Sequence, residues 1–472
     1  MMSSPSIYWY DFETFGSDPR TDRVCQFAGI RTDEELNIIS EPLVIYCKPS
    51  NDFLPNPFAC LITGITPQKA LSEGINEVDF AQQINREFSA PGTCVAGYNN
   101  IRFDDELMRR LLYRNFFDPY EREYKNGNSR WDIIDMLRLC GATRPEGINW
   151  PKKENGTNSF KLDELTVENN IDHKDAHDAL ADVFATIEMA RLVKRRQPKL
   201  YTHVFKHRQK NEVKAALDVV VQKPMLHVSM HYSAKKGCLG LVLPICPHPT
   251  QSNRIIVYDL SDDPSTWINL EAEDIRSRIN TKRKVPLKVI PTNSCPVLVT
   301  PKILSQEQQQ KFSLDIDACL KHAKLLQSNS AIKEVVAEAY KVEQASEETD
   351  PDFMIYAGNF FDEHDKKLMV MIRNTNPNDL GRLDLPFHDN RLPEMFFRYR
   401  ARNFNETLSE EELNRWDEFR RKKFKDTDAI NTFKENLQKA SIQLNKGNAI
   451  EGKEVLSSLH QYAIQLEDSL KL

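Results

Sequence analysis

The sequence predicts three parts: an α/β domain with a mixed sheet, a β-rich domain and a C-terminal helical domain. Strand and helix patterns alternate over residues 1–198, short β-like runs dominate residues 199–348, and helical periodicity dominates residues 353–472. A chain of 472 residues is also too long for one ordinary hydrophobic core.

The first domain opens with the apolar run "IYWYDFETFG", which we interpret as a strand. Strands are expected next at "VCQFAGIRTD" and "PLVIYCKPS", as antiparallel neighbours, because turn residues bound both. A helix at "EVDFAQQINREFS", a strand at "TCVAGYNN", a helix from Asp104 and a strand at "RWDIIDMLRLC" follow. The domain closes with the helical "AHDALADVFATIEMARLVKRRQ", which Pro198 ends.

The second domain is predicted from five β-like runs punctuated by proline and glycine: "PMLHVSM", "CLGLVLPICP", "RIIVYDL", "VPLKVIP" and "CPVLVTP". They suggest a small barrel or half-barrel, with a helix at "SLDIDACLKHAKLLQSN" after it. The acidic stretch 341–352 is expected to be a linker. Beyond it the pattern is helical, as in "DEHDKKLMVMIRN", "LPEMFFRYRARNF" and "SEEELNRWDEFRRKKF".

Composition narrows the class of protein. The chain is 40% hydrophobic and 28% charged, and no apolar run is long enough to span a bilayer, so we expect no membrane association. The first strand begins a few residues after Met1, so we expect no signal peptide. Nine scattered cysteines without a CxxC pair argue against a disulfide framework and a zinc site, and favour the cytoplasm. The net charge of −6 means that local basic patches must hold any polyanion.

Two acids in the opening strand raise a chemical question. Asp11 and Glu13 are two residues apart, so their side chains share one face of a strand. Neighbouring carboxylates repel and resist desolvation unless a cation lies between them. Hard divalent ions such as Mg²⁺ take oxygen ligands. The alternative is a pair of strand-end acids exposed to water.

Further acids recur later in the domain. Asp104 and Asp105 lie where a strand turns into a helix, and "HKDAHDALADV" supplies His177, Asp178 and Asp182. Acids at helix N-termini are common caps, so Asp104 and Asp178 are as well explained by structure. Asp182 lies beside the apolar stripe of the last helix and needs a partner there. His177 alone would more often be a surface histidine.

Together these residues resemble the DEDDh 3′–5′ exonuclease superfamily. Its three motifs appear in order as "DFET", "NIRFD" ending at Asp104, and H-x4-D from His177 to Asp182, with "WDIIDMLRL" between the last two. The H-x4-D spacing favours the histidine branch over the tyrosine branch. Further segments resemble the bacterial exodeoxyribonuclease I family over nearly the whole chain, including "LITGITPQ", "GYNNIRFDDE", "NSRWDIIDM", "RPEGINWP" and "FRYRARNF".

The resemblance implies a ribonuclease H-like exonuclease domain, an SH3-like β-rich domain and a helical C-terminal domain. It implies a 3′→5′ exonuclease that degrades single-stranded DNA to 5′-mononucleotides, in DNA repair and recombination. Asp11, Glu13, Asp104 and Asp182 would hold two Mg²⁺ ions, which Mn²⁺ can replace, and His177 would accept a proton from the attacking water. The expected partners are single-stranded DNA and, from the resemblance alone, single-stranded DNA-binding protein. We expect a monomer.

Single strands bind in grooves that combine cations with aromatic faces. "MRRLLYRNFFDPYEREY" offers both, although an aromatic core face with a solvated basic face explains about half of its residues. Phe12 and Phe15 flank the acids and could pack a terminal base. The expected DNA contacts are Glu13, Arg109, Tyr120, Tyr124, Arg138, Phe160, Lys161 and Lys210.

Two basic stretches are candidate phosphate tracks. Residues 191–214 contain nine Lys and Arg against one Glu, which is also typical of a solvated helix end. Residues 276–284 are similar. The catalytic motifs alone leave open a DEDDh ribonuclease, a proofreading subunit or an inactive DNA-binding scaffold. More than 250 residues beyond the nuclease domain disfavour the first two, and the full set of active-site residues disfavours the third.

Overall fold

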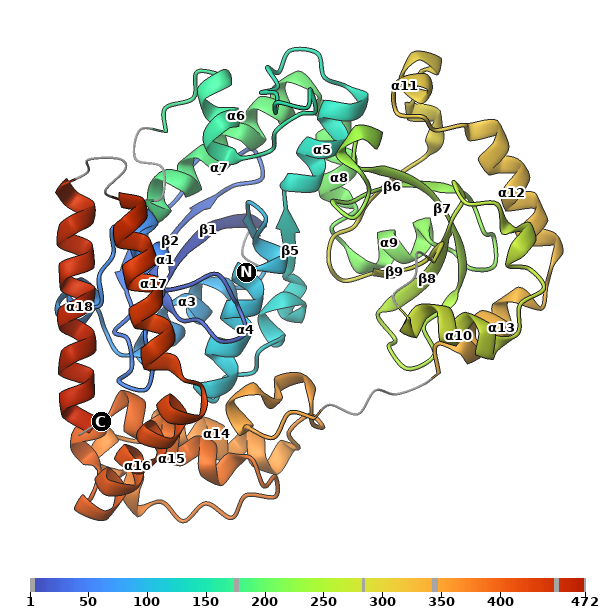
Figure 1. Cartoon of the computed structure of the whole chain (residues 1–472). Coiled ribbons are helices and arrows are strands. Elements are labelled where there is room, and N and C mark those ends of the chain that lie inside the picture. The colour runs from blue at the N-terminus through green and yellow to red at the C-terminus, as the bar shows by residue number, and fades with distance from the viewer. Residues whose placement is uncertain (1–4, 174–177, 282–284, 342–346, 445–449, 471–472) are drawn as a thin grey trace.

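The structure is a computed structural model that describes residues 5–173, 178–281, 285–341, 347–444 and 450–470. It contains a five-stranded mixed sheet between helices, a second five-stranded sheet and a C-terminal set of helices (Figure 1). The predicted order of an α/β, a β-rich and a helical part is confirmed.

The first sheet has the strand order β3-β2-β1-β4-β5. The central strand β1 pairs antiparallel with β2 and parallel with β4, which makes the sheet mixed. Its strands are β1 (Ser6–Thr14), β2 (Val24–Thr32), β3 (Leu43–Tyr46), β4 (Thr93–Gly97) and β5 (Ser129–Asp132). The helices of this part are α1 (Pro57–Thr63), α2 (Pro67–Glu73), α3 (Glu77–Phe88), α4 (Asp104–Arg114), α5 (Ile134–Thr143), α6 (Leu162–Glu168) and α7 (Ala179–Arg196).

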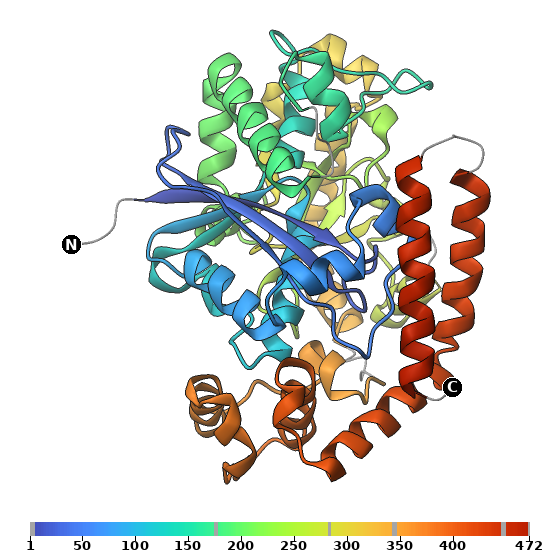
Figure 2. The same ribbon diagram turned by 90° about the vertical axis from the view of Figure 1, so that its left-hand side faces the viewer.

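Alternation along β1 sends its side chains into two different cores. Ile7 and Trp9 pack with residues of α5 and α7 on one face, whereas Tyr8, Tyr10 and Phe12 pack with residues of α3 and α4 on the other. Figure 2 shows the sheet between green helices on one side and the light-blue α3 on the other. With a period of two, Asp11 and Glu13 continue the face of Ile7 and Trp9, towards α7.

One predicted strand is partly wrong. "RWDIIDMLRLC" forms β5 only as far as Asp132, and α5 begins at Ile134. The Asp132 carboxylate accepts hydrogen bonds from the backbone N–H of Ile134 and of Asn99, at 3.0 and 2.9 Å. This side chain therefore ties the end of β5 to the loop after β4 and binds the first N–H of α5, an arrangement that the apolar run alone does not reveal.

The second sheet has the order β10-β6-β7-β8-β9 and is antiparallel throughout. Among the residues that the structure describes, β9 and β10 are the two edges and do not pair, so the sheet is a half-barrel rather than a closed barrel. Its strands are β6 (Met225–Val228), β7 (Leu239–Pro247), β8 (Arg254–Asp259), β9 (Leu287–Pro291) and β10 (Val297–Val299). The accompanying helices are α8 (Pro198–Lys206), α9 (Lys210–Ala216), α10 (Ala272–Asn280), α11 (Gln306–Lys311), α12 (Ile316–Ser328) and α13 (Ile332–Ala339).

The C-terminal helices return to the first domain. The hairpin of α17 and α18 lies against α1 and α2, as both views show (Figures 1 and 2). This part comprises the 3₁₀ helix η7 (Pro351–Tyr356) and the helices α14 (Glu363–Asn374), α15 (Leu392–Asn403), α16 (Glu410–Asp426), α17 (Ala429–Leu444) and α18 (Ile450–Leu470). Among the described residues, we find no helix with the length and apolar character needed to cross a membrane.

Candidate active site

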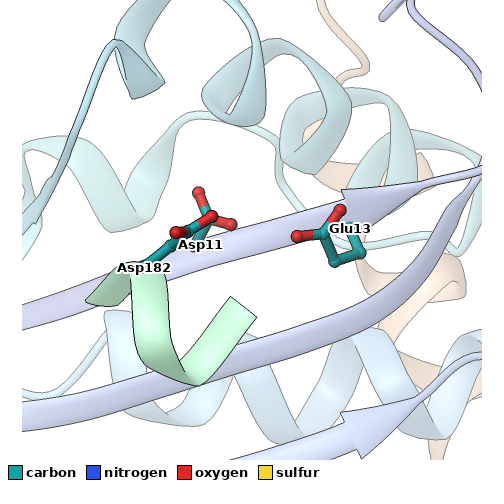
Figure 3. Close-up of side chains that lie close together, drawn as sticks. All are labelled: Asp11, Glu13 and Asp182. Carbon is teal, nitrogen blue, oxygen red and sulfur yellow. The ribbon is translucent and has the colours of Figure 1, made fainter. Parts of the chain in front are cut away.

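Strand β1 and helix α7 bring three acids together. One carboxylate oxygen from each of Asp11, Glu13 and Asp182 lies within 4.8 Å of the others (Figure 3). Asp11 and Glu13 share a face of β1, and Asp182 lies in the first turn of α7. Asp178 caps that helix by accepting hydrogen bonds from Leu180 N and Ala181 N, both at 3.1 Å. The cap fixes where α7 starts and so places Asp182 over the two strand acids.

Asp104 adjoins this cluster without belonging to the three-oxygen group. It is the first residue of α4 and is 5% exposed. The turn before it contains Asn99 with φ of 60°, a left-handed conformation that asparagine tolerates well. Asp132 accepts the backbone N–H of Asn99, as described above, and so holds the turn that presents Asp104.

Three of these acids have pKa values above their ordinary range. Burial, then the charges of Asp104 and Asp182, raise the pKa of Asp11 well above its ordinary value. Burial, then Asp11 and Asp182, raise the pKa of Glu13 to about 9. Burial followed by the Asp105 charge raises the pKa of Asp104. These carboxylates therefore resist ionising together unless positive charge is supplied.

The donor set fits a hard divalent cation. Asp11, Glu13 and Asp182 offer only oxygen donors, at spacings that one ion can bridge, and Asp104 is near enough for its charge to raise the pKa of Asp11. Neutralisation by a bound cation would remove the repulsion that raises these pKa values. We therefore regard the site as a candidate metal centre.

A histidine that the sequence reasoning missed contacts the cluster. His173 Nε2 lies 2.5 Å from Asp182 Oδ1, and His173 Nδ1 lies 3.0 Å from Thr166 Oγ1. The imidazole thus bridges Asp182 to α6 and fixes the orientation of that carboxylate. The available signal was a second histidine four residues before His177 in "DHKDAH". His177 itself lies outside the described residues.

One group of predicted DNA contacts lies along α4 and the segment after it. Arg109 makes a bidentate pair with Glu123, at 2.8 Å from Nε and 3.1 Å from Nη2, and lies over the ring of Tyr120. Tyr124 is 64% exposed. Tyr120 thus lies near a cation and Tyr124 is open to solvent, whereas most donors of Arg109 are already engaged within the protein.

A second group lies at α5 and α6. Arg138 is buried, pairs with Asp135 at 2.6 Å and lies over the ring of Phe160, which packs on Trp150. Lys161, next to Phe160, is exposed and pairs with Glu164. Lys210 lies apart from this group, at the start of α9, and donates to Asn253 in the β-rich domain.

Several aromatic side chains proposed to contact DNA are buried instead. Phe12 packs on the face of β1 opposite Glu13, and Phe15 lies fully buried against α17 and α18. The prediction that these two rings pack a terminal base is therefore wrong. Phe116 and Phe117 also belong to the core beside α4, as the alternative reading of that segment expected.

The basic stretch 191–214 does not form one uniform exposed track. Arg191 donates to the carbonyl of Leu36, and Lys194 pairs with Glu35 at 2.7 Å. Arg208 donates to Ser129 and lies over the ring of Phe205. These cations join elements of the protein to one another. For the stretch 276–284, residues 282–284 lie outside the described residues.

Comparison with protein-family models gives three matches in chain order. Residues 8–190 match the model described as Exonuclease. Residues 208–342 match the Exonuclease I SH3-like domain, and residues 349–466 match the Exonuclease I C-terminal domain.

Individual relatives agree over almost the whole chain. Exodeoxyribonuclease I of Escherichia coli (strain K12) is 44% identical over 427 residues, covering 89% of this chain and 90% of that protein. The Haemophilus influenzae enzyme of the same name is 41% identical over 476 residues, covering 99% of this chain and all of that protein.

Solved structures share the fold. E. coli exonuclease I in complex with a dA16 oligonucleotide has a TM-score of 0.93 and 42% identity, covering 98% of this chain and 100% of that chain. A complex of ExoI with SSB-Ct, at 41% identity, has a TM-score of 0.91 with the same coverage. The zinc ion bound form of an E. coli ExoI–ssDNA complex, at 42% identity, likewise has a TM-score of 0.91 and that coverage.

Proposed function

The chain belongs to the exodeoxyribonuclease I family, and from this premise we propose that it removes 5′-mononucleotides from the 3′ end of single-stranded DNA. The observation that carries the proposal is the convergence of Asp11, Glu13 and Asp182, whose carboxylate oxygens lie within 4.8 Å of one another. The related E. coli enzyme is solved with a DNA oligonucleotide, which supports single-stranded DNA as the substrate.

We propose that Asp11, Glu13, Asp104 and Asp182 hold two Mg²⁺ ions, with Mn²⁺ as a substitute. When bound, such a pair activates a water and stabilises the leaving oxygen of a phosphodiester. Hard oxygen donors suit Mg²⁺ better than a soft metal. Within the chain, Asp178 positions the helix that carries Asp182, and Asp132 positions the turn before Asp104. His173 orients the Asp182 carboxylate.

The proton of the attacking water needs an acceptor, and His177 is our candidate. The spacing to Asp182 matches the H-x4-D motif of the family. An ordinary imidazole has a pKa of about 6.5, so its neutral form is available at physiological pH.

For DNA binding we propose Glu13 at the 3′ end, together with two groups. The first is Arg109, Tyr120 and Tyr124, and the second is Arg138, Phe160 and Lys161, with Lys210 further along the strand. Each group combines cations with aromatic rings, as single-strand sites do. Single-stranded DNA-binding protein is a proposed partner, because a related enzyme is solved with SSB-Ct.

We place this activity in DNA repair and recombination, in the cytoplasm, where the nine free cysteines would stay reduced. We also propose that the chain acts as a monomer and divides at residues 1–198, 199–348 and 353–472. Support for the first boundary is the end of α7 at Arg196, just before Pro198.

The test uses single- and double-stranded DNA and a matching RNA oligomer, each labelled at the 5′ or the 3′ end. With Mg²⁺, single-stranded DNA should release its 3′ label first as a mononucleotide, and EDTA should stop the reaction. Faster hydrolysis of the RNA oligomer would make the chain a ribonuclease. Hydrolysis that persists in EDTA would reject the metal centre.

A further inference from the structure

A polar cavity of about 560 Å³ borders α4, the helix that begins at Asp104. Its walls come from the loop after β1, from α4 and from the segment that includes η7. The residues that line it are Arg20, Arg110, Glu347, Glu348, Phe353, Tyr356 and Ala357. Both β1 and α4 also carry candidate metal ligands. At 1.5 Å per residue, Arg110 lies only about 9 Å along α4 from Asp104.

Two arginines give the cavity its positive charge. Arg20 has a side chain that is 58% exposed and lies over the ring of Phe353. Arg110 is 7% exposed, donates from Nε to Glu106 at 2.8 Å and lies over the ring of Tyr356. Its Nη1 atom is buried and finds no hydrogen-bond partner among the residues that the structure describes. Arg110 therefore keeps donor capacity that its protein neighbours do not use.

A carboxylate of the chain itself meets this positive charge. Glu348 forms an ion pair with Arg20 across 328 residues of sequence, and Glu347 lines the same cavity. The backbone N–H of Asp350 donates to Glu348 at 3.0 Å, which orients the carboxylate. A carboxylate and a phosphodiester offer a guanidinium the same pair of oxygen acceptors, so one can replace the other.

We propose that Arg20 and Arg110 form a phosphate-binding subsite for the single-stranded DNA substrate, which the Glu348 carboxylate occupies in the free protein and a phosphodiester of the strand displaces. The inference rests on the proposed function. Arg20 then has an anionic partner both in the free protein, where it is Glu348, and in the DNA complex, where it is a phosphodiester. Displacement is inexpensive because the Arg20 side chain is 58% exposed, and water screens an ion pair that it reaches. The pair therefore weakens DNA binding by competition from within the chain.

The test is equilibrium binding of a fluorescein-labelled oligo-dT in EDTA, measured by fluorescence anisotropy over a range of salt concentrations. Arg20→Gln should weaken binding about three- to tenfold and reduce the slope of log K against log salt by about 0.7, the value for one phosphate contact on a single strand. Glu348→Gln should tighten binding about threefold or more, because the competitor is gone.

A matched control separates local competition from net charge. Glu435→Gln removes the same charge from α17, where the Glu435 side chain is 69% exposed, and should leave affinity within about twofold of wild type. In the double variant R20Q/E348Q, the gain from Glu348→Gln should disappear, because the two residues act on the same contact.

Two results would overturn the subsite. One is an Arg20→Gln variant that binds like wild type with the same salt slope. The other is an equal gain from Glu348→Gln with and without Arg20, which would reveal a general effect of charge. Failure of the proposed function looks different, since the wild-type protein itself would then neither bind nor hydrolyse the single strand.

Discussion

Replacement of Asp11 by asparagine should make the metal-free protein more stable. The oxygens of Asp11, Glu13 and Asp182 lie within 4.8 Å of one another. Two full charges at that separation repel by about 3 kcal/mol at an effective dielectric constant of roughly 20. Proton uptake by Glu13, whose pKa is raised to about 9, already relieves part of this cost at neutral pH. We therefore expect Asp11→Asn to raise the unfolding free energy in EDTA by about 1–3 kcal/mol.

A divalent cation should reverse the order of stability. Mg²⁺ at one hundred times its dissociation constant would stabilise the wild-type protein by about 2.7 kcal/mol. The Asp11→Asn variant should gain less than half of this, because one charged ligand is missing. Native-state hydrogen exchange of the amides in β1 and α7 measures the stability of the elements that carry the acids, independently of the other domains. Measured with EDTA and with Mg²⁺, it gives both the effect of the substitution and the gain from the cation.

The control is Glu73→Gln, which removes an exposed acid from the end of α2. It should change the unfolding free energy by no more than about 0.5 kcal/mol, with or without Mg²⁺. Mutual repulsion of these acids would be refuted if Asp11→Asn destabilised the protein in EDTA, or if the variant gained as much from Mg²⁺ as the wild type does.

The other predictions address catalysis, positioning, DNA binding and stability. His177→Ala should reduce turnover at saturating DNA by about a hundredfold or more with little change in affinity, and unchanged turnover would remove the residue from its role. His173→Ala should weaken Mg²⁺ binding about tenfold, measured by calorimetry, because Asp182 loses its orienting contact; an unchanged constant would contradict this. If about six phosphates are neutralised, log K for a DNA oligonucleotide should fall with log salt at a slope of about −4, and a flat plot would exclude a phosphate track. Burial disfavours the charged form of Glu77, but Arg114 and Arg23 outweigh it and lower its pKa to about 2. Because the folded pKa lies below the unfolded one, this contribution of about 3 kcal/mol is present above pH 4.5 and is lost as pH falls towards 2. In urea unfolding at different pH values, the difference between wild type and Glu77→Gln should shrink over that interval, and a constant difference would refute the assignment.

The sequence could predict the acid cluster because its causes are local. The alternation of β1 places Asp11 and Glu13 on one face, and the helical pattern of α7 places Asp182 next to its apolar stripe. Three carboxylates brought together in this way repel one another unless a cation or a proton neutralises part of their charge. The contact of His173 with Asp182 involves a segment without periodicity, so its only signal in the sequence was a second histidine four residues before His177.

The fate of the aromatic side chains was harder to predict. Periodicity shows that Phe12 faces away from Glu13, but it does not show that α3 and α4 cover that face. Phe15 follows the end of β1 and is fully buried. It belongs to a core cluster that combines residues of the first domain, such as Phe53, with residues of α17 and α18, more than 400 residues later. Such burial depends on long-range packing, which local sequence does not encode.

The number of arginines in a segment overestimates how many of them can contact DNA, because long-range packing engages some of them within the protein. The basic segment "FRYRARNF" contains Arg402, whose side chain is 3% exposed and which binds Asp52 at 2.9 Å and Asp352 at 2.6 Å. Burial by itself raises the pKa of Asp52. The contact with Arg402 outweighs this effect, together with other nearby cations, and helps to hold the pKa well below its ordinary value. Loss of one partner from such a buried pair is costly, so a DNA phosphate cannot readily displace either acid. The pair of Arg20 and Glu348 is different, because the Arg20 side chain is 58% exposed and solvent already weakens the ion pair there. Exposure of the ion pair, and not the number of cations, therefore decides which arginines this acidic protein can offer to a DNA strand.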